Sequence, residues 1–183
     1  GPGCPCVVGG IAAAPAEGRL SGGTRPVSDR QAIVNIFLDE KSVVKRGAKV
    51  EHERKVAIYD LLEENVFHPA GDFDGPYNLH LGIEANCLVF DIRSKDDTPL
   101  TRCHLPLKVC RKIVKDYFMI CESYFEAIKI KTPSQIEVID MGRRGLHNEG
   151  AEIVKDHLEG KVELDRATAR RLFTLICVLH IRA

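Results

Sequence analysis

The 183-residue chain has no tryptophan, only two methionines and only 6% aromatic residues. It also lacks a surplus of either charge, because 26 basic residues balance 26 acidic ones. A balanced charge argues against a dedicated binder of nucleic acid or of an acidic membrane surface, which needs a net basic face. No apolar run approaches the roughly 18 residues that a membrane-spanning helix requires, so no membrane partner is predicted. Hydrophobic residues still make up 44% of the chain, enough for the core of one domain.

The first 28 residues differ in composition from the rest of the chain. They are rich in Gly, Ala and Pro, show no periodicity, and lack the cationic segment and apolar stretch of a signal peptide. We expect residues 1–28 to be a disordered extension and residues 29–183 to form a single α+β domain. Cys4 and Cys6 are not followed by a second ligand pair at zinc-finger spacing, so they predict no metal site.

The seven cysteines are an odd number and are scattered along the chain. Five of them lie inside apolar or periodic segments: Cys87, Cys103, Cys110, Cys121 and Cys177. This distribution is typical of buried, reduced thiols in a cytosolic protein, and it does not resemble a disulfide framework.

Alternating apolar residues predict a sheet in the first half of the chain. We expect a strand over residues 32–38, and then a helix over residues 51–65 with Val56, Tyr59 and Leu62 on its apolar stripe. A hairpin follows, with its turn at residues 85–86 and a third strand over residues 100–105. In the predicted register every apolar residue of the hairpin opposes another apolar residue: Ile83 faces Leu88, Leu81 faces Phe90, and Leu79 faces Ile92.

Helical spacing dominates the second half. Residues 110–128 predict an aromatic-rich helix that is apolar nearly all round, and is therefore buried in a core or by a partner chain. Thr132 and Gln135 predict a capping box at the start of the next helix. We expect Asn148 to begin a further helix, residues 161–164 to form a short strand, and Asp165 to cap the last helix. The expected architecture is a small, mostly antiparallel sheet packed on one face by four or five helices.

The segment from Gly142 to Gly150 predicts a polar break between two helices, and with it an anion-binding site. A helix that begins at Asn148 presents free amides, and Arg143, Arg144 and His147 precede it. The candidate anion-binding residues are therefore Arg143, Arg144, His147, Asn148 and Gly150. Glu149 opposes this interpretation, because its negative charge lies where the anion would bind. The alternative is a kinked helix in which Gly142 and Gly145 allow a tight crossing and the arginines pair with local acids.

Two other groups of residues are candidates for chemistry. In the predicted register His80 lies opposite Asp91, and a carboxylate beside an imidazole raises its basicity, as a general base requires. The alternative is an ordinary cross-strand pair of opposite charges on a solvated sheet. Arg166, Arg170 and Arg171 form a basic patch that, with the arginines at 143 and 144, is suited to an acidic partner or an RNA backbone; the alternative is a solvated face.

Neither a metal site nor a cofactor is predicted. The carboxylates and imidazoles nearest to one another in the sequence are Glu51, His52, Glu53, His147 and Glu149. None of them has the i, i+4 spacing of two histidines that a helical zinc site requires. Glycine-rich phosphate loops and nucleophile elbows are also missing from the sequence.

Several long motifs resemble an uncharacterised protein family of alphaproteobacteria. The resemblance covers roughly residues 33–180, and its motifs are EHER at 51–54, DLLEEN at 60–65, GPY at 75–77, LVFDIR at 88–93, IVKDYFMICESY at 113–124, DMGRRGLHNEG at 140–150 and ARRLFTLICVLH at 169–180. It implies a bacterial, cytosolic protein, and it implies no activity, ligand or catalytic residue.

Two functions remain open from the sequence. The first is a non-catalytic regulatory or protein-interaction domain, with an unknown protein partner or with self-association as a homodimer through the aromatic helix around Tyr117 to Phe125. The second is a small enzyme or sensor that binds an anionic metabolite, a phosphate or a carboxylate, at Arg143 to Gly150. We favour the first, because no convincing pair of nucleophile and base is present and the aromatic helix has more apolar surface than one contact face needs.

Overall fold

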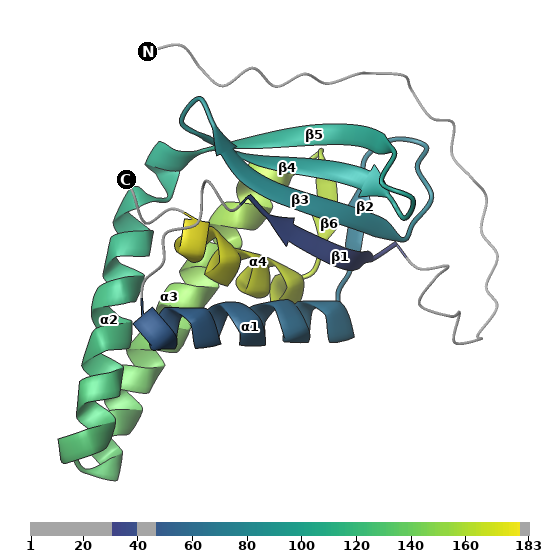
Figure 1. Ribbon diagram of the computed structural model, residues 1–183. Coiled ribbons are helices and arrows are strands. Elements are labelled where there is room, and N and C mark those ends of the chain that lie inside the picture. The colour runs from purple at the N-terminus through teal and green to yellow at the C-terminus, as the bar shows by residue number, and fades with distance from the viewer. Residues whose placement is uncertain (1–30, 40–46, 180–183) are drawn as a thin grey trace.

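A computed structural model describes residues 31–39 and 47–179 of the protein. Within them lie a four-stranded sheet, a two-stranded sheet and four α-helices (Figure 1). The predicted α+β class is therefore confirmed. The prediction of a disordered extension at residues 1–28 falls outside the described residues.

The main sheet has the strand order β1-β3-β4-β5. Its strands are β1 (Ile33–Leu38), β3 (Tyr77–Glu84), β4 (Cys87–Ser94) and β5 (Pro99–Pro106). β1 runs parallel to β3, whereas the two other pairings are antiparallel. The second sheet pairs β2 (Phe67–Pro69) with β6 (Val162–Leu164), which confirms the short strand predicted at 161–164.

The predicted register of the β3–β4 hairpin is confirmed. The apolar pairs are Ile83 with Leu88, Leu81 with Phe90, and Leu79 with Ile92. Ala85 and Asn86 form the turn, with φ of 49° and 60°. Two consecutive positive φ values are those of a type I′ turn, whose twist matches that of the flanking strands. Leu79, Leu81 and Phe90 are fully buried or nearly so, because the alternation directs them all to the helix-covered face.

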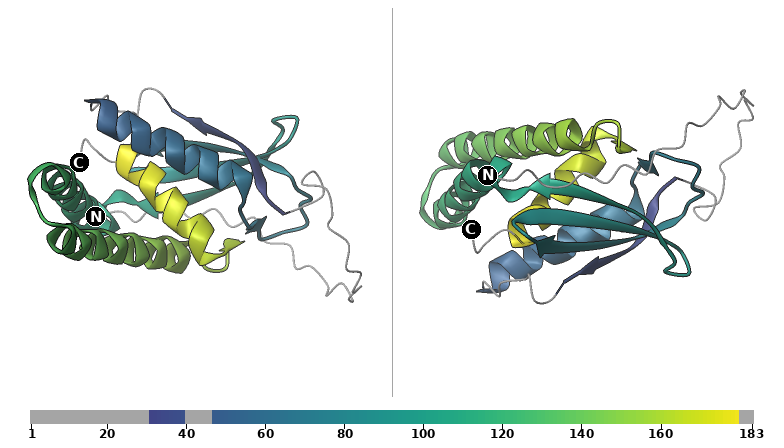
Figure 2. Two further views of the ribbon diagram at one scale, coloured as in Figure 1. Left: turned by 90° about the horizontal axis from the view of Figure 1, so that it is seen from below. Right: turned by 90° about the horizontal axis from the view of Figure 1, so that it is seen from above.

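The helices α1 (Gly47–Glu63), α2 (Arg111–Ile130), α3 (Pro133–Leu158) and α4 (Arg166–Leu179) lie on one face of the main sheet (Figure 1). α4 is the central helix of this layer, because both α1 and α3 pack against it (Figure 2). Every residue from Leu172 to Leu179 is buried. α2 and α3 form an antiparallel helical hairpin that extends beyond the sheet.

The helix caps predicted at the starts of α3 and α4 are confirmed. The Thr132 amide donates a hydrogen bond to Gln135 Oε1 at 3.2 Å, within the predicted capping box of α3. The Thr168 amide donates to Asp165 Oδ1 at 2.8 Å, so Asp165 caps α4 as predicted. Each cap satisfies an amide that has no partner within its own helix.

The apolar stripe predicted for α1 is wrong at two of its three residues, and only Leu62 packs against the core. Val56 and Tyr59 are 40% and 65% exposed, whereas Ala57 and Leu61 are buried in the core. α1 is therefore rotated about its axis relative to the prediction, so that Ala57 and Leu61 face the core.

The aromatic helix α2 contributes mainly to the core of the chain itself. Ile113, Val114, Tyr117 and Cys121 are all buried. Because Tyr117 is buried in the core of its own chain, it is not available to a dimer interface through the stretch from Tyr117 to Phe125. Of the exposed apolar residues of α2, Met119 and Ile130 lie on the opposite side of the helix, whereas Ile128, seven residues after Cys121, continues the buried side.

Four of the cysteines are buried thiols that form no disulfide, namely Cys103, Cys110, Cys121 and Cys177. Cys87 is disulfide-bonded, so the prediction of a reduced thiol is wrong there. In the described ranges no helix combines the length and the apolar character that a membrane crossing demands.

Candidate functional site

The predicted break between two helices does not exist, because α3 runs without interruption from Pro133 to Leu158. Tertiary packing explains why its glycines do not end the helix. A Cβ atom at Gly142 would lie 2.7 Å from Ile120 Cδ1, and one at Gly150 would lie 2.4 Å from Phe173 Cγ. Both glycines therefore allow a neighbouring side chain to approach the helix backbone.

The continuous helix removes one half of the predicted anion site. The amides of residues 149–151 lie in the middle of α3 and not at its start, so they are not available to an anion. Asn148 is exposed and begins no helix, and Gly150 is buried against α4. The prediction is therefore wrong in its mechanism and in these two residues.

The other half of the prediction leads to a cavity of about 280 Å3 between α1, α3 and α4. We call it the basic cavity. Its lining includes the three remaining predicted residues: Arg143, Arg144 and His147. α4 adds Arg170 and Arg171 from the basic patch, whereas α1 contributes the carboxylates of Glu53 and Asp60; Val56, Ala57, Ala167 and Thr174 complete the lining. Residues of the predicted anion site and of the predicted basic patch thus meet at one place.

Two of the arginines are held in place by one carboxylate of their own helix. Arg143 Nη2 lies 2.9 Å from Asp140 Oδ1, and Arg144 Nε lies 3.0 Å from Asp140 Oδ2. The hydrogen bond from Arg143 lowers the pKa of the Asp140 carboxyl. Arg143 also lies over the ring of Tyr124, 4.7 Å from its centroid. The local pairing that the sequence left as an alternative is therefore present.

The arginines from α4 differ in their partners. Arg171 donates from Nη1 to the carbonyl oxygen of Glu64 at 2.7 Å. Arg170 is half-buried, and within the described residues its guanidinium has neither an ion pair nor a hydrogen bond. A guanidinium carries five N–H donors, so the partly desolvated Arg170 is the group at this cavity with the greatest unsatisfied capacity.

His147 lines the same cavity as a neutral imidazole. Burial, together with the smaller effect of the positive charges of Arg170 and Arg143, lowers its pKa from 6.5 to about 4. The ring packs edge-on against Tyr117, with the centroids 4.9 Å apart, and also contacts Phe173. At neutral pH His147 therefore contributes a polar, uncharged wall.

The charges around the basic cavity leave a positive excess. Arg143, Arg144, Arg170 and Arg171 supply four positive charges, and Glu53, Asp60 and the adjacent Asp140 supply three negative ones. Positive charge is concentrated on α3 and α4, whereas Glu53 and Asp60 lie on α1. The cavity therefore offers cations to a ligand from one side and hydrogen-bond acceptors from the other.

The second predicted site lies on the face of the sheet that the helices leave open. His80 and Asp91 are cross-strand neighbours as predicted. Their side chains have other partners, however: His80 Nε2 lies 2.7 Å from Asp97 Oδ1, and Arg93 Nη2 lies 2.8 Å from Asp91 Oδ2. Phe37 stacks on His80 with ring centroids 4.6 Å apart. A His80–Asp91 catalytic pair is therefore not assembled.

Asp97 is the residue that the sequence prediction missed in this cluster. It belongs to the turn between β4 and β5 and has a φ of 68°. Its carboxylate reaches back to the strands and also accepts a hydrogen bond from Arg93 at 2.9 Å. The hydrogen bond from His80 lowers the pKa of Asp97. An acidic residue in a tight turn is an ordinary signal, so nothing in the sequence connected it to His80.

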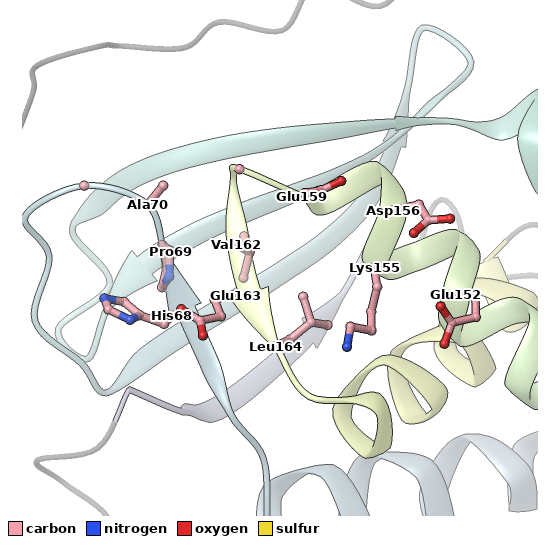
Figure 3. A pocket seen from close by; sticks show the side chains of 12 residues that line it. His68, Pro69, Ala70, Glu152, Lys155, Asp156, Glu159, Val162, Glu163 and Leu164 are labelled. Carbon is pink, nitrogen blue, oxygen red and sulfur yellow. The ribbon is translucent and has the colours of Figure 1, made fainter.

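A further cavity, of about 700 Å3, lies between the small sheet and the end of α3 (Figure 3). Most of the charged side chains around it are acidic: Glu152, Asp156, Glu159 and Glu163. The basic members of the lining are Lys155 and His68. Glu152 is already paired with Arg166 at 2.7 Å. Over the described ranges no three His, Cys, Asp or Glu side chains are close enough to hold a metal ion.

Comparison with known proteins gives the affiliation of the chain. Residues 30–182 match the model of an uncharacterised protein family, UPF0262. The chain belongs to this family. A UPF0262 protein of Paramagnetospirillum magneticum is 65% identical over 153 residues, which cover 84% of this chain and 98% of the relative. A UPF0262 protein of Rhodospirillum rubrum is 58% identical over 156 residues, 85% of this chain and 96% of the relative.

A third UPF0262 protein, of Rhodopseudomonas palustris strain BisA53, is 55% identical over 155 residues, 85% of this chain and 95% of the relative. These relatives come from alphaproteobacteria, so the resemblance found in the sequence motifs is confirmed. No solved structure matches the chain.

Proposed function

We propose that this UPF0262 protein is a non-catalytic regulatory domain that binds a small anionic metabolite in the basic cavity. The observation that carries the proposal is Arg170, a half-buried guanidinium that forms no ion pair with any residue the structure describes, at a cavity with three further arginines. Desolvating a cation without a partner is unfavourable, and a bound anion removes that penalty. We also propose a cytoplasmic location, as the resemblance of the motifs to the alphaproteobacterial family implies.

Arginine is the residue best suited to a phosphate or carboxylate group. Its planar fork of donors matches two oxygens at once, and such charge-assisted hydrogen bonds are roughly twice as strong as neutral ones. Arg143 and Arg144 are fixed by Asp140, so part of the site is organised before a ligand binds. We expect Arg170 to make the strongest contact, because its guanidinium has no competing partner among residues 31–39 and 47–179.

The size and the carboxylate wall restrict the ligand further. A volume of about 280 Å3 lies at the lower end of the range for small-molecule sites, which favours a metabolite over a macromolecule. Glu53 and Asp60 repel a ligand that is negative throughout. They favour a molecule whose phosphate or carboxylate group faces α4 while its hydroxyl or amino groups face α1.

A thermal-shift titration tests this proposal. The melting temperature is measured against inorganic phosphate and against citrate, with sodium chloride adjusted to keep the ionic strength constant. A ligand that binds only the folded state raises stability by RT ln(1 + [L]/Kd), so a rise of the melting temperature that saturates with concentration is expected for at least one of the two anions.

The matched variants are Arg170→Ala and Arg166→Ala. Both remove one arginine from the same helix, but Arg166 is paired with Glu152 outside the basic cavity. We expect Arg170→Ala to abolish the anion-dependent shift and Arg166→Ala to retain it. An equal shift in both variants would show general salt stabilisation and would refute the proposed site.

A further inference from the structure

Two carboxylates of α1 line the basic cavity and have no partner in the described part of the chain. Glu53 and Asp60 are both half-buried, and neither side chain forms an ion pair or a hydrogen bond among residues 31–39 and 47–179. Val56 and Ala57 lie between them in the lining, and spacings of three and four residues place all four on one side of the helix. α1 therefore presents two unpaired negative charges to the cavity.

The arginines of the cavity do not neutralise these acids. Those of α3 are paired with Asp140, and Arg171 donates to the carbonyl oxygen of Glu64. Arg170 forms no ion pair with either acid, although opposite charges attract one another more strongly in a partly desolvated cavity than in water. Because Arg170 lines the cavity from α4 and the acids line it from α1, a molecule inside the cavity can contact both walls.

Given the anion site proposed above, on which this inference rests, we propose that the ligand is a small acidic amino acid or amino phosphate. Its carboxylate or phosphate group binds Arg170, and its ammonium group pairs with Glu53 or Asp60. An anion without an amino group would satisfy Arg170 but leave both acids unpaired. A hydroxyl group has one neutral donor, whereas an ammonium group has three donors, and its bonds to a carboxylate are roughly twice as strong.

The size and charge of the cavity limit the class of ligand. A water molecule in the liquid occupies about 30 Å3, so the cavity of about 280 Å3 holds roughly nine non-hydrogen atoms. Aspartate and O-phosphoethanolamine are within this size, whereas a nucleotide exceeds it. Both are net anions at neutral pH, which agrees with the positive excess of the cavity.

A metal ion is a poorer match for the same two acids. Seven residues correspond to about 10 Å along a helix, so Glu53 and Asp60 lie too far apart to hold one ion together. Among the residues that the structure describes, no three His, Cys, Asp or Glu side chains form a metal-binding group, and Mg2+ and Ca2+ need several oxygen ligands. An ammonium group needs only one carboxylate, so each acid is a position for it.

Ligand pairs that differ in one amino group test the inference. Isothermal titration calorimetry of the full chain, at pH 7.5 and constant ionic strength, compares L-aspartate with succinate and O-phosphoethanolamine with ethyl phosphate. The wild type should bind the amino member of at least one pair about tenfold more tightly, as expected for a charged hydrogen bond to a half-buried carboxylate. Comparison of the two pairs distinguishes a carboxylate from a phosphate as the anionic group.

Substitutions of the same shape remove the acids of α1. The double variant Glu53→Gln/Asp60→Asn should lose the preference for the amino member and bind the amino-free member at least as tightly as the wild type. The two single variants show which acid makes the ion pair. Glu63→Gln is the matched control, because Glu63 is an exposed acid of the same helix outside the cavity, and it should bind like the wild type. A double variant that keeps the preference would overturn the inference.

Two further outcomes are distinguishable. Equal affinities within each pair in the wild type, with binding lost in Arg170→Ala, would refute the ammonium contact and leave the anion site intact. Saturable binding of none of the four compounds would contradict the anion site itself, and the ammonium contact with it.

Discussion

Replacing Gly150 by alanine tests how α3 and α4 fit together. The new Cβ atom would lie 2.4 Å from Cγ and 2.5 Å from both Cδ atoms of Phe173. Carbon atoms in contact are normally about 3.5–4.0 Å apart, so the methyl group would overlap the ring by more than 1 Å. Phe173 is fully buried, and the edge of Tyr117 lies against it with centroids 5.6 Å apart, so it has little room to move.

Two opposing effects set the size of the change. Overfilling a packed core typically costs 1–3 kcal/mol, and alanine in place of glycine within a helix returns at most about 1 kcal/mol. Because the overlap is with a ring and not with a flexible side-chain end, the cost lies at the upper end of its range, and we expect Gly150→Ala to lower the free energy of unfolding by a net of about 2 kcal/mol. The melting temperature should fall by roughly 4–8 °C.

Gly145→Ala is the matched control, five residues earlier in the same helix. Its Cβ atom meets nothing within 4 Å, so this variant should be more stable than the wild type by about 0.5–1 kcal/mol. Urea unfolding followed by circular dichroism, at a concentration low enough to exclude association, gives both values. Equal effects of the two substitutions, or a neutral Gly150→Ala, would refute the packing described for this crossing.

Three further predictions concern stability. The pKa of His147 is about 4 in the folded protein and 6.5 without burial, so the unfolded chain gains a proton first as the pH falls. The free energy of unfolding should therefore drop between pH 6.5 and 4. Urea unfolding at pH 7 and at pH 4.5 measures this loss, and His147→Gln should reduce it by about 2 kcal/mol. Asn65→Ala removes two hydrogen bonds to the Ile33 backbone, of 2.7 and 2.9 Å, and should lower the free energy of unfolding by about 2–3 kcal/mol, whereas a neutral result would contradict the role of Asn65 in anchoring β1. Asp165→Ala should lower the melting temperature by an amount that corresponds to about 1 kcal/mol, and Asp165→Ser should recover most of it if the bond to Thr168 is the cause.

The β3–β4 hairpin shows what a sequence can determine alone. Three apolar pairs match in only one register, and a shift of one residue would turn Leu79 and Leu81 towards solvent. The helix caps at Thr132 and Asp165 were equally predictable, because each depends on residues no more than three positions apart.

The error at Gly142 to Gly150 has a different origin. Glycine weakens a helix by about 1 kcal/mol per residue, and the polar residues around it offered no reason for α3 to continue. The reasons lie on other elements, since Ile120 of α2 and Phe173 of α4 fill the space beside two of the glycines. Propensity is a local quantity, and long-range packing outweighs it here.

The basic cavity was predictable in its residues but not in its assembly. Arg143, Arg144 and His147 were candidates because they are close in sequence, and Arg170 and Arg171 formed a separate basic patch. Their meeting depends on how α3 crosses α4, and no sequence spacing encodes that crossing. The same limit applies to Asp97, which reaches His80 only because the turn after β4 folds back.

Isothermal titration calorimetry with inorganic phosphate at pH 7.5 and constant ionic strength tests the basic cavity most directly. The wild-type chain should give a saturable heat that fits one site per chain, and Arg170→Ala should give only heats of dilution, while Arg166→Ala should match the wild type. Absence of saturable heat in the wild type, or the same Kd in Arg170→Ala, would contradict an anion site at this cavity.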